Sequence, residues 1–237
     1  MITKQLHCFA GKRWSGDATS ALNSALKAGG IVVTEGDEDL ERRLNRAGIS
    51  DVRRLNMRWL FGALRLSRLL RLTNPDEVVI YSSALIPKMR QAISLAKMPQ
   101  VEIKDLSDKI FLPEVKPVKQ GNSLIWIGYI TKHCGLRTLL EVLKEIPEVG
   151  LKVVGEGEAK IVSPLLKLSK TPELRGRIDW RGEQEDVYSE MNGCLAGIVT
   201  SENPQEKLVY HEFKNAGLPV ITATDAHQLK QQIISLL

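Results

Sequence analysis

One carboxylate in this chain falls where water cannot fully solvate it. When residues 207–216 are projected on a helix of 3.6 residues per turn, Leu208, Phe213 and Ala216 share one face, and Glu212 lies inside that apolar arc. Gly217 follows as a C-cap that tolerates a left-handed backbone. A carboxylate in an apolar stripe is costly to desolvate without a partner. We therefore expect Glu212 either to be paired inside the protein or to hold a ligand.

The segment HEFKNAGLPVI, which contains Glu212, resembles the E-A-M-A-x-G-x-P-V-I signature of the GT-B glycosyltransferases of family 4 and related sugar-nucleotide transferases. In that family the glutamate sits at the start of a helix and binds the ribose hydroxyls of the nucleotide. The resemblance implies the same role for Glu212. The alternative is an ordinary strand-helix-strand unit with a salt-bridged glutamate.

Two glycines follow a predicted strand in LKVVGEGEAK, which is similar to the family's strand-G-x-G segment. The resemblance implies that the backbone at Gly155 and Gly157 approaches the nucleotide, and the alternative is a tight strand-to-helix turn. A dinucleotide fingerprint would require a third glycine where Lys160 stands.

The segment IWIGYITKHCGLRTLLEVL resembles the family's V-G-R-x-x-x-x-K-G segment, which opens the donor domain. There an arginine and a lysine stabilise negative charge on the departing diphosphate. In this chain Tyr129 and Cys134 occupy those two positions. We expect the backbone near Gly128 to line the donor site and Lys132 to reach the phosphates from a shifted loop. The alternative is that Lys132 is a solvated loop residue.

The donor loop departs from the family pattern as well. The family commonly carries a first glutamate eight residues before the second, and Pro204 stands at that position here. Glu202 and Glu206 flank it, and we expect one of them to contact the sugar. Lys207 is expected to approach the diphosphate, helped by the amides of the helix N-terminus, with an ordinary surface lysine as the alternative.

Strands alternate with helices along the whole sequence, which predicts parallel sheets covered on both faces. A break with prolines and glycine at residues 112–122 separates two such series. We therefore predict an α/β protein of two Rossmann-like domains facing each other across a cleft, the GT-B layout in reduced length. Residues 1–115 would form the acceptor-side domain and residues 116–237 the nucleotide-sugar-binding domain.

A basic stripe marks the predicted helix in Met57–Leu72. Arg58, Arg65 and Arg68 line one side of it, with Arg54 extending the stripe if the helix starts earlier, and apolar residues occupy the opposite face. Such helices suit an anionic membrane surface, as in relatives that glycosylate lipid-linked acceptors. The alternative is a domain helix that packs on its sheet and leaves its arginines in water.

Composition limits the remaining possibilities. With 43% hydrophobic residues and a net charge of +5, the chain fits a soluble globular protein, and its charge allows an anionic partner, which could be a nucleotide, a lipid surface or a nucleic acid. Charge alone does not choose among these partners, and the resemblance implies a nucleotide-sugar rather than a nucleic acid. Three scattered cysteines and four histidines show no metal-ligand spacing, and no apolar run reaches the length of a membrane span. We expect a cytoplasmic protein, with peripheral contact at the inner face of the membrane as a further option.

These observations favour a glycosyltransferase of polysaccharide biosynthesis. It would move a hexosyl group from a nucleoside-diphosphate sugar to an acceptor hydroxyl on a sugar or lipid-linked acceptor, without metal or other cofactor. No residue is assigned as catalytic. Tyr129, Cys134 and Pro204 at the altered positions motivate one alternative, a non-catalytic partner protein of a glycosylation system. A nucleotide-sugar epimerase on the same fold is another.

Overall fold

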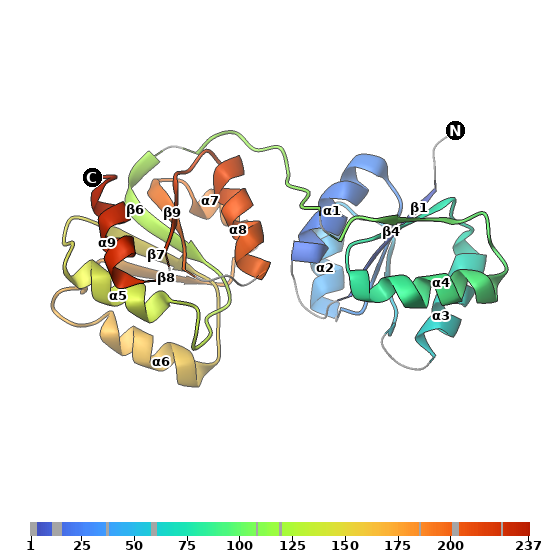
Figure 1. Ribbon diagram of the computed structural model, residues 1–237, viewed down its shortest axis with the longest axis horizontal. Coiled ribbons are helices and arrows are strands. Elements are labelled where there is room, and N and C mark those ends of the chain that lie inside the picture. Colours follow the sequence, from blue (N-terminus) through green and yellow to red (C-terminus); the bar gives the residue numbers. More distant parts are fainter. Residues whose placement is uncertain are drawn as a thin grey trace. The chain divides into compact units, whose positions relative to one another are not determined.

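The structure is a computed structural model that describes residues 4–10, 16–36, 38–57, 61–107, 109–118, 120–184, 186–200, 204–223 and 225–237, with backbone alone at 16–17, 120 and 204–207. The chain forms two compact units, Met1–Pro113 and Glu114–Leu237. Figure 1 shows a layer of strands with helices on both sides in each unit.

The first unit holds a parallel five-stranded sheet in the order β3-β2-β1-β4-β5. Its strands are β1 (Gln5–Phe9), β2 (Ile31–Thr34), β3 (Val52–Arg54), β4 (Glu77–Ile80) and β5 (Glu102–Asp105). Its helices are α1 (Gly16–Ala28), α2 (Glu38–Arg46), α3 (Gly62–Thr73) and α4 (Ile86–Ala96), with a single 3-10 turn, η1 (Ser83–Leu85), before α4. The central strands are buried on both faces, which explains their runs of valine and isoleucine. One buried cluster joins the sheet to α3 and α4, and another joins it to α1 and α2.

The second unit repeats this plan in the order β10-β9-β6-β7-β8. Its strands are β6 (Gln120–Ile127), β7 (Gly150–Val154), β8 (Ile178–Gly182), β9 (Cys194–Val199) and β10 (Val220–Thr222). Its helices are α5 (Leu136–Lys144), α6 (Ala159–Leu168), α7 (Val187–Glu190), α8 (Pro204–Asn215) and α9 (Ala226–Ile234). Helices α5, α6 and α9 cover one face of the sheet, and α7 and α8 cover the other.

Counted from its own first strand, each sheet has the order 3-2-1-4-5, which is that of a Rossmann-like sheet. The predicted pair of Rossmann-like domains is therefore confirmed. In such sheets the direction of strand succession reverses between the first and fourth strands, and ligands bind beyond the carboxyl ends of the strands at that point. In the second unit these two strands are β6 and β9, so we expect a ligand-binding site in the segments that follow them.

Three boundaries differ from the sequence predictions. The edge strand β3 was not predicted, because two of its three residues are arginines. Arg54 belongs to this strand and pairs with Glu41 of α2 at 2.8 Å, so it does not extend the basic stripe of α3. Helix α3 begins at Gly62, and Arg58 lies outside the described residues. The predicted linker is shorter than expected, because β6 already begins at Gln120.

The guanidinium group of Arg177 joins the connection after α6 to the end of α5 and to the connection that follows α5. Arg177 donates to the carbonyl oxygens of Glu173 at 2.7 Å, Val149 at 2.7 Å and Leu143 at 3.0 Å, and also to that of Ile146. Three of these carbonyl groups, those of Leu143, Ile146 and Val149, lie at or just after the end of α5, where the last turn of a helix leaves carbonyls without regular helical partners. The five-donor fork of arginine suits this position, whereas a lysine ammonium cannot span these acceptors.

We therefore expect Arg177→Lys to lower the free energy of unfolding of the second unit by about 2–4 kcal/mol, because several partly buried carbonyls lose a charge-assisted partner. Urea denaturation checks this. Arg175→Lys is the matched control, since that exposed side chain lies two residues away and should change stability by less than about 0.5 kcal/mol. Equal effects of the two substitutions would contradict the role given to Arg177.

Candidate functional site

The loops that follow β6 and β7 are joined to each other through their backbones. The amide of Gly128 donates to the carbonyl of Val154 at 3.0 Å, and the amide of Ile130 donates to the carbonyl of Glu156 at 2.7 Å. Ile130 and Gly157 also form an isolated parallel bridge. The two loops therefore extend the sheet beyond the carboxyl ends of its strands. We call this surface, residues 128–135 with residues 155–158, the ledge.

Gly155 stands where no other residue fits. Its φ is +134°, and a Cβ atom there would lie 1.8 Å from the carbonyl oxygen of Gly128. Gly128 and Gly155 are therefore in direct backbone contact. The positive φ and the contact with Gly128 explain why position 155 needs a glycine, and contact between these glycines and a nucleotide stays a prediction.

Thr200 directly follows β9 and connects the carboxyl end of that strand to the ledge, which follows β6 and β7. Its hydroxyl donates to the carbonyl of Cys134 at 2.5 Å and accepts from the indole of Trp126 at 3.1 Å. Gly135 has a φ of +73°, and a Cβ atom there would lie 2.5 Å from the Cβ of Thr200. Thr200 is not among the site residues predicted from the sequence. A threonine directly after a buried strand was the available signal, but its partners come from distant parts of the chain.

The ledge carries an exposed cation but not at the family position. Cys134, which stands where the resemblance expects a lysine, is buried at 4% exposure. Lys132 and His133 are both exposed on the same loop. Position 134 therefore supplies no cation to the surface of the ledge. The lysine that the ledge exposes to solvent is Lys132.

Glu212 is buried, as the helical projection predicted. It is 6% exposed, and its helical neighbours Val209 and Phe213 belong to one buried cluster with Ile127 and Val154, the last residues of β6 and β7. No described residue of the second unit forms an ion pair or a hydrogen bond with its carboxylate. Burial away from water raises the pKa of Glu212 to about 7.

Helix α8 begins earlier than the resemblance implies. Its first residue is Pro204, so Glu212 lies roughly 12 Å from the helix start rather than at it. Helical side chains lean toward the N-terminus of their helix, which in this case is the end that follows β9. The carboxylate of Glu212 is therefore directed back toward the end of the sheet that carries the ledge.

A tyrosine lies near this carboxylate. Tyr188 of α7 accepts a hydrogen bond from the side-chain amide of Asn215 at 3.3 Å, which links α7 to the last turn of α8. Burial raises the pKa of Tyr188 to about 12, and the charge of Glu212 contributes to the increase. Its phenol therefore stays protonated at neutral pH, and sequence reasoning did not single it out.

The other predicted site residues lie outside what the structure describes. Glu202 falls in residues 201–203, and Lys207 is the fourth residue of α8 but its side chain is not described. Across the described ranges there is no group of three or more metal-ligating side chains, and no helix long and apolar enough to span a bilayer.

Comparison with known proteins identifies the fold. No protein-family model matches the chain, and no curated protein matches it in sequence. Solved structures do match. HepE of Anabaena, in complex with UDP and glucose, is 13% identical with a TM-score of 0.74, over 98% of this chain and 89% of that one. A glycosyltransferase from Rickettsia africae is 12% identical with a TM-score of 0.70, over 98% and 88%.

WaaG, a glycosyltransferase involved in lipopolysaccharide biosynthesis, is 13% identical with a TM-score of 0.53, over 98% of this chain and 89% of that one. These likenesses run through both units. The chain therefore has the GT-B fold, as the resemblance implied, and it is similar in fold to group 1 glycosyltransferases.

The raised pKa of Glu212 makes stability depend on pH in a definite direction. The pKa of the Glu212 carboxyl group is 4.5 in the unfolded chain and about 7 in the folded chain. Between these values the folded state binds more protons, so the stabilisation is fully present below 4.5 and is lost as pH rises through 7. A glutamine at position 212 would have nearly the same shape but cannot ionise, so its protein does not lose stability over this pH range.

We expect Glu212→Gln to match the wild type in free energy of unfolding near pH 4.5 and to exceed it by on the order of 2–3 kcal/mol near pH 8. Urea denaturation at a series of pH values measures this difference. The exposed Glu148→Gln substitution is the control and should be flat across the series. A Glu212→Gln protein that is less stable at every pH would instead show that the carboxylate has a cationic partner.

Proposed function

We propose that the second unit binds a nucleoside-diphosphate sugar and that the protein transfers its hexosyl group to an acceptor hydroxyl. The observation that carries this proposal is Glu212, a buried carboxylate on the helix that follows β9, with which no described residue of the second unit pairs. The GT-B fold supports it, since HepE of the same fold binds UDP and glucose. The acceptor, a sugar or a lipid-linked sugar, is assigned to the first unit.

Ribose would provide the partner that Glu212 lacks among the described residues of its unit. Two hydroxyl groups donate to one carboxylate, and each charge-assisted bond contributes roughly 1.5–3 kcal/mol before desolvation is subtracted. These bonds favour the ionised form, which lowers the pKa of Glu212 in the complex. Near neutral pH nucleotide binding therefore releases a proton from Glu212.

The diphosphate is assigned to side chains and to a helix terminus more than to the ledge amides. The amides of Gly128, Ile130 and Gly155 already donate within the protein, the last of them to Gly182 at 2.7 Å. Lys132 on the ledge, Lys207 and the first amides of α8 are the donors assigned to the phosphates. Backbone at Gly128, Gly155 and Gly157 would line the site by close contact.

The chemistry needs cationic stabilisation of the leaving group. The bond between the anomeric carbon and the β-phosphate oxygen breaks, and its electron pair stays on the departing nucleoside diphosphate. The acceptor oxygen forms the new bond to that carbon, and its proton is released to water. Lysine charge near the departing diphosphate lowers the barrier without a metal ion. Cys134 is buried where the family's lysine would be, and this favours one second candidate, a protein that binds the nucleotide-sugar without transferring it.

Calorimetric titration with UDP tests the role of Glu212. At about pH 8 we expect Glu212→Gln to weaken binding by roughly ten-fold or more, about 1.4 kcal/mol, because an amide cannot accept from two hydroxyls as a carboxylate does. In the wild type the affinity should rise with pH up to the pKa of about 7, and in the mutant it should be constant. Wild-type affinity for UDP in the mutant would remove the ribose assignment.

Transfer assays with UDP-sugars separate the two candidates. If the protein is a transferase, Lys132→Ala or Lys207→Ala should lower kcat by on the order of 10²-fold, with activity unaffected by a chelator. Lys170→Ala, at an exposed position away from the ledge, is the control. Full activity in both site variants would contradict the phosphate assignment, and binding of UDP with no transfer would favour the binding protein.

A further inference from the structure

Lys132 lies at the tip of a tight turn whose two ends are buried. The amide of Cys134 donates to the carbonyl of Thr131 at 3.4 Å, which closes a four-residue turn with Lys132 and His133 at its centre. Ile130 and Cys134, which flank this tip, are only 1% and 4% exposed. Lys132 and His133 are exposed, so the turn presents both side chains to solvent.

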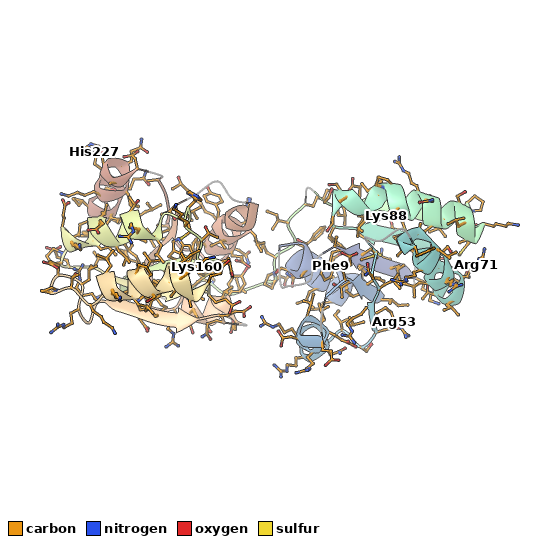
Figure 2. All side chains as sticks on the ribbon, turned by 90° about the horizontal axis from the view of Figure 1, so that it is seen from below. Phe9, Arg53, Arg71, Lys88, Lys160 and His227 are labelled. Carbon is orange, nitrogen blue, oxygen red and sulfur yellow. The ribbon has the colours of Figure 1, made fainter. Side chains whose placement is uncertain are left out.

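Lys132 has no acidic partner among the residues that the structure describes. Lys160, at the start of α6 (Figure 2), pairs instead with Glu158 of the ledge at 2.7 Å. Lys132 also stands on the loop that follows β6, one of the two strands between which the order of the sheet reverses. Of these two lysines, Lys132 is therefore the one whose charge is available to a ligand at this end of the sheet.

The hydroxyl of Thr200 holds one end of this turn. It donates to the carbonyl of Cys134, which lies 66 residues away in the sequence. The indole of Trp126 can only donate, so it bonds to the oxygen of Thr200 and leaves the hydroxyl hydrogen for Cys134. Threonine is stiff at χ1, and the backbone at Gly135 lies directly against its side chain. The hydroxyl of Thr200 therefore has one fixed direction.

A second pairing of an indole with a hydroxyl in the same unit serves as a comparison. Trp180 of β8 donates to the hydroxyl of Ser169 at 3.2 Å, and this hydroxyl donates to the carbonyl of Leu166 at 2.9 Å. That acceptor lies three residues before Ser169, so the hydroxyl only completes the end of its own helix, α6. The hydroxyl of Thr200 instead joins the end of β9 to the loop that carries Lys132.

We propose that Thr200 is a positioning residue that holds Lys132 in place to contact the diphosphate of the bound nucleotide. This role rests on the proposed function, which assigns Lys132 to the phosphates. Without the hydroxyl, the carbonyl of Cys134 and the indole of Trp126 lose their shared partner, and one end of the turn is released. The ligand itself then has to order Lys132, which weakens the contribution of the diphosphate to binding.

Titration with UDP and with uridine separates the contribution of the diphosphate from that of the nucleoside. Thr200→Val nearly keeps the shape of the side chain but removes the hydroxyl. We expect it to weaken binding of UDP roughly five-fold or more and to leave binding of uridine within about two-fold of the wild type. Thr200→Ser keeps the hydroxyl and should restore binding of UDP. In a Lys132→Ala background, Thr200→Val should weaken UDP binding by no more than about two-fold, because the side chain through which Thr200 acts is absent.

Ser169→Ala is the matched control, because it removes a hydroxyl from an indole and a carbonyl at the end of α6 that lies away from the ledge. Both Thr200→Val and Ser169→Ala should lower the melting temperature, since each leaves polar groups without a partner. Only Thr200→Val should change the ratio of the affinities for UDP and uridine. The titrations are made well below the lowest melting temperature, so that every variant is folded.

Equal weakening of UDP and uridine binding in Thr200→Val would overturn this role, because the hydroxyl would then support the fold alone. Unchanged binding of UDP in Thr200→Val would overturn it too, as would the full loss of affinity in the Lys132→Ala background. In each of these cases Glu212→Gln still weakens UDP binding if the nucleotide site is correctly assigned. A wild-type protein that binds neither UDP nor uridine would instead overturn the proposed function, and the role of Thr200 with it.

Discussion

The burial of the Glu212 carboxylate, with no cation beside it among the described residues of its unit, constrains the second unit. Rotation of α8 cannot turn Glu212 toward solvent, because the next residue, Phe213, packs tightly against the sheet. The ring of Phe213 lies directly over Gly197 of β9, where a Cβ atom would be only 2.2 Å from the ring. Any rotation that exposed Glu212 would lift Phe213 out of its cluster. The packing that stabilises α8 therefore also holds the carboxylate in a place where its ionised form is unfavourable.

Such an arrangement has a physical use when a ligand supplies the missing donors. The ledge is also held in place before a ligand binds. Backbone hydrogen bonds and the hydroxyl of Thr200 connect the ends of three strands there. A surface that is already rigid loses little conformational entropy when a ligand binds. The ledge lies where a Rossmann-like sheet of this strand order binds its ligands, and the lean of helical side chains directs the Glu212 carboxylate toward that end. Fold, packing and electrostatics thus point to the same end of the same sheet.

Much of the fold could be predicted from the sequence, because buried strands and amphipathic helices have different periods. The burial of Glu212 followed from the helical projection alone, and the structure confirms it. The short strand β3 could not be predicted, since an edge strand with two arginines lacks the apolar pattern. The reason for a glycine at position 155 could not be predicted either, since it depends on the carbonyl of Gly128, brought close only by the fold. The partners of Thr200 were hidden for the same reason.

A crystal structure of the protein with UDP bound tests the central claim most directly. The account predicts both ribose hydroxyls within about 2.5–3.2 Å of the carboxylate oxygens of Glu212, with the phosphates near Lys132 and the start of α8. UDP bound with its ribose elsewhere, and Glu212 still without a partner, would contradict it.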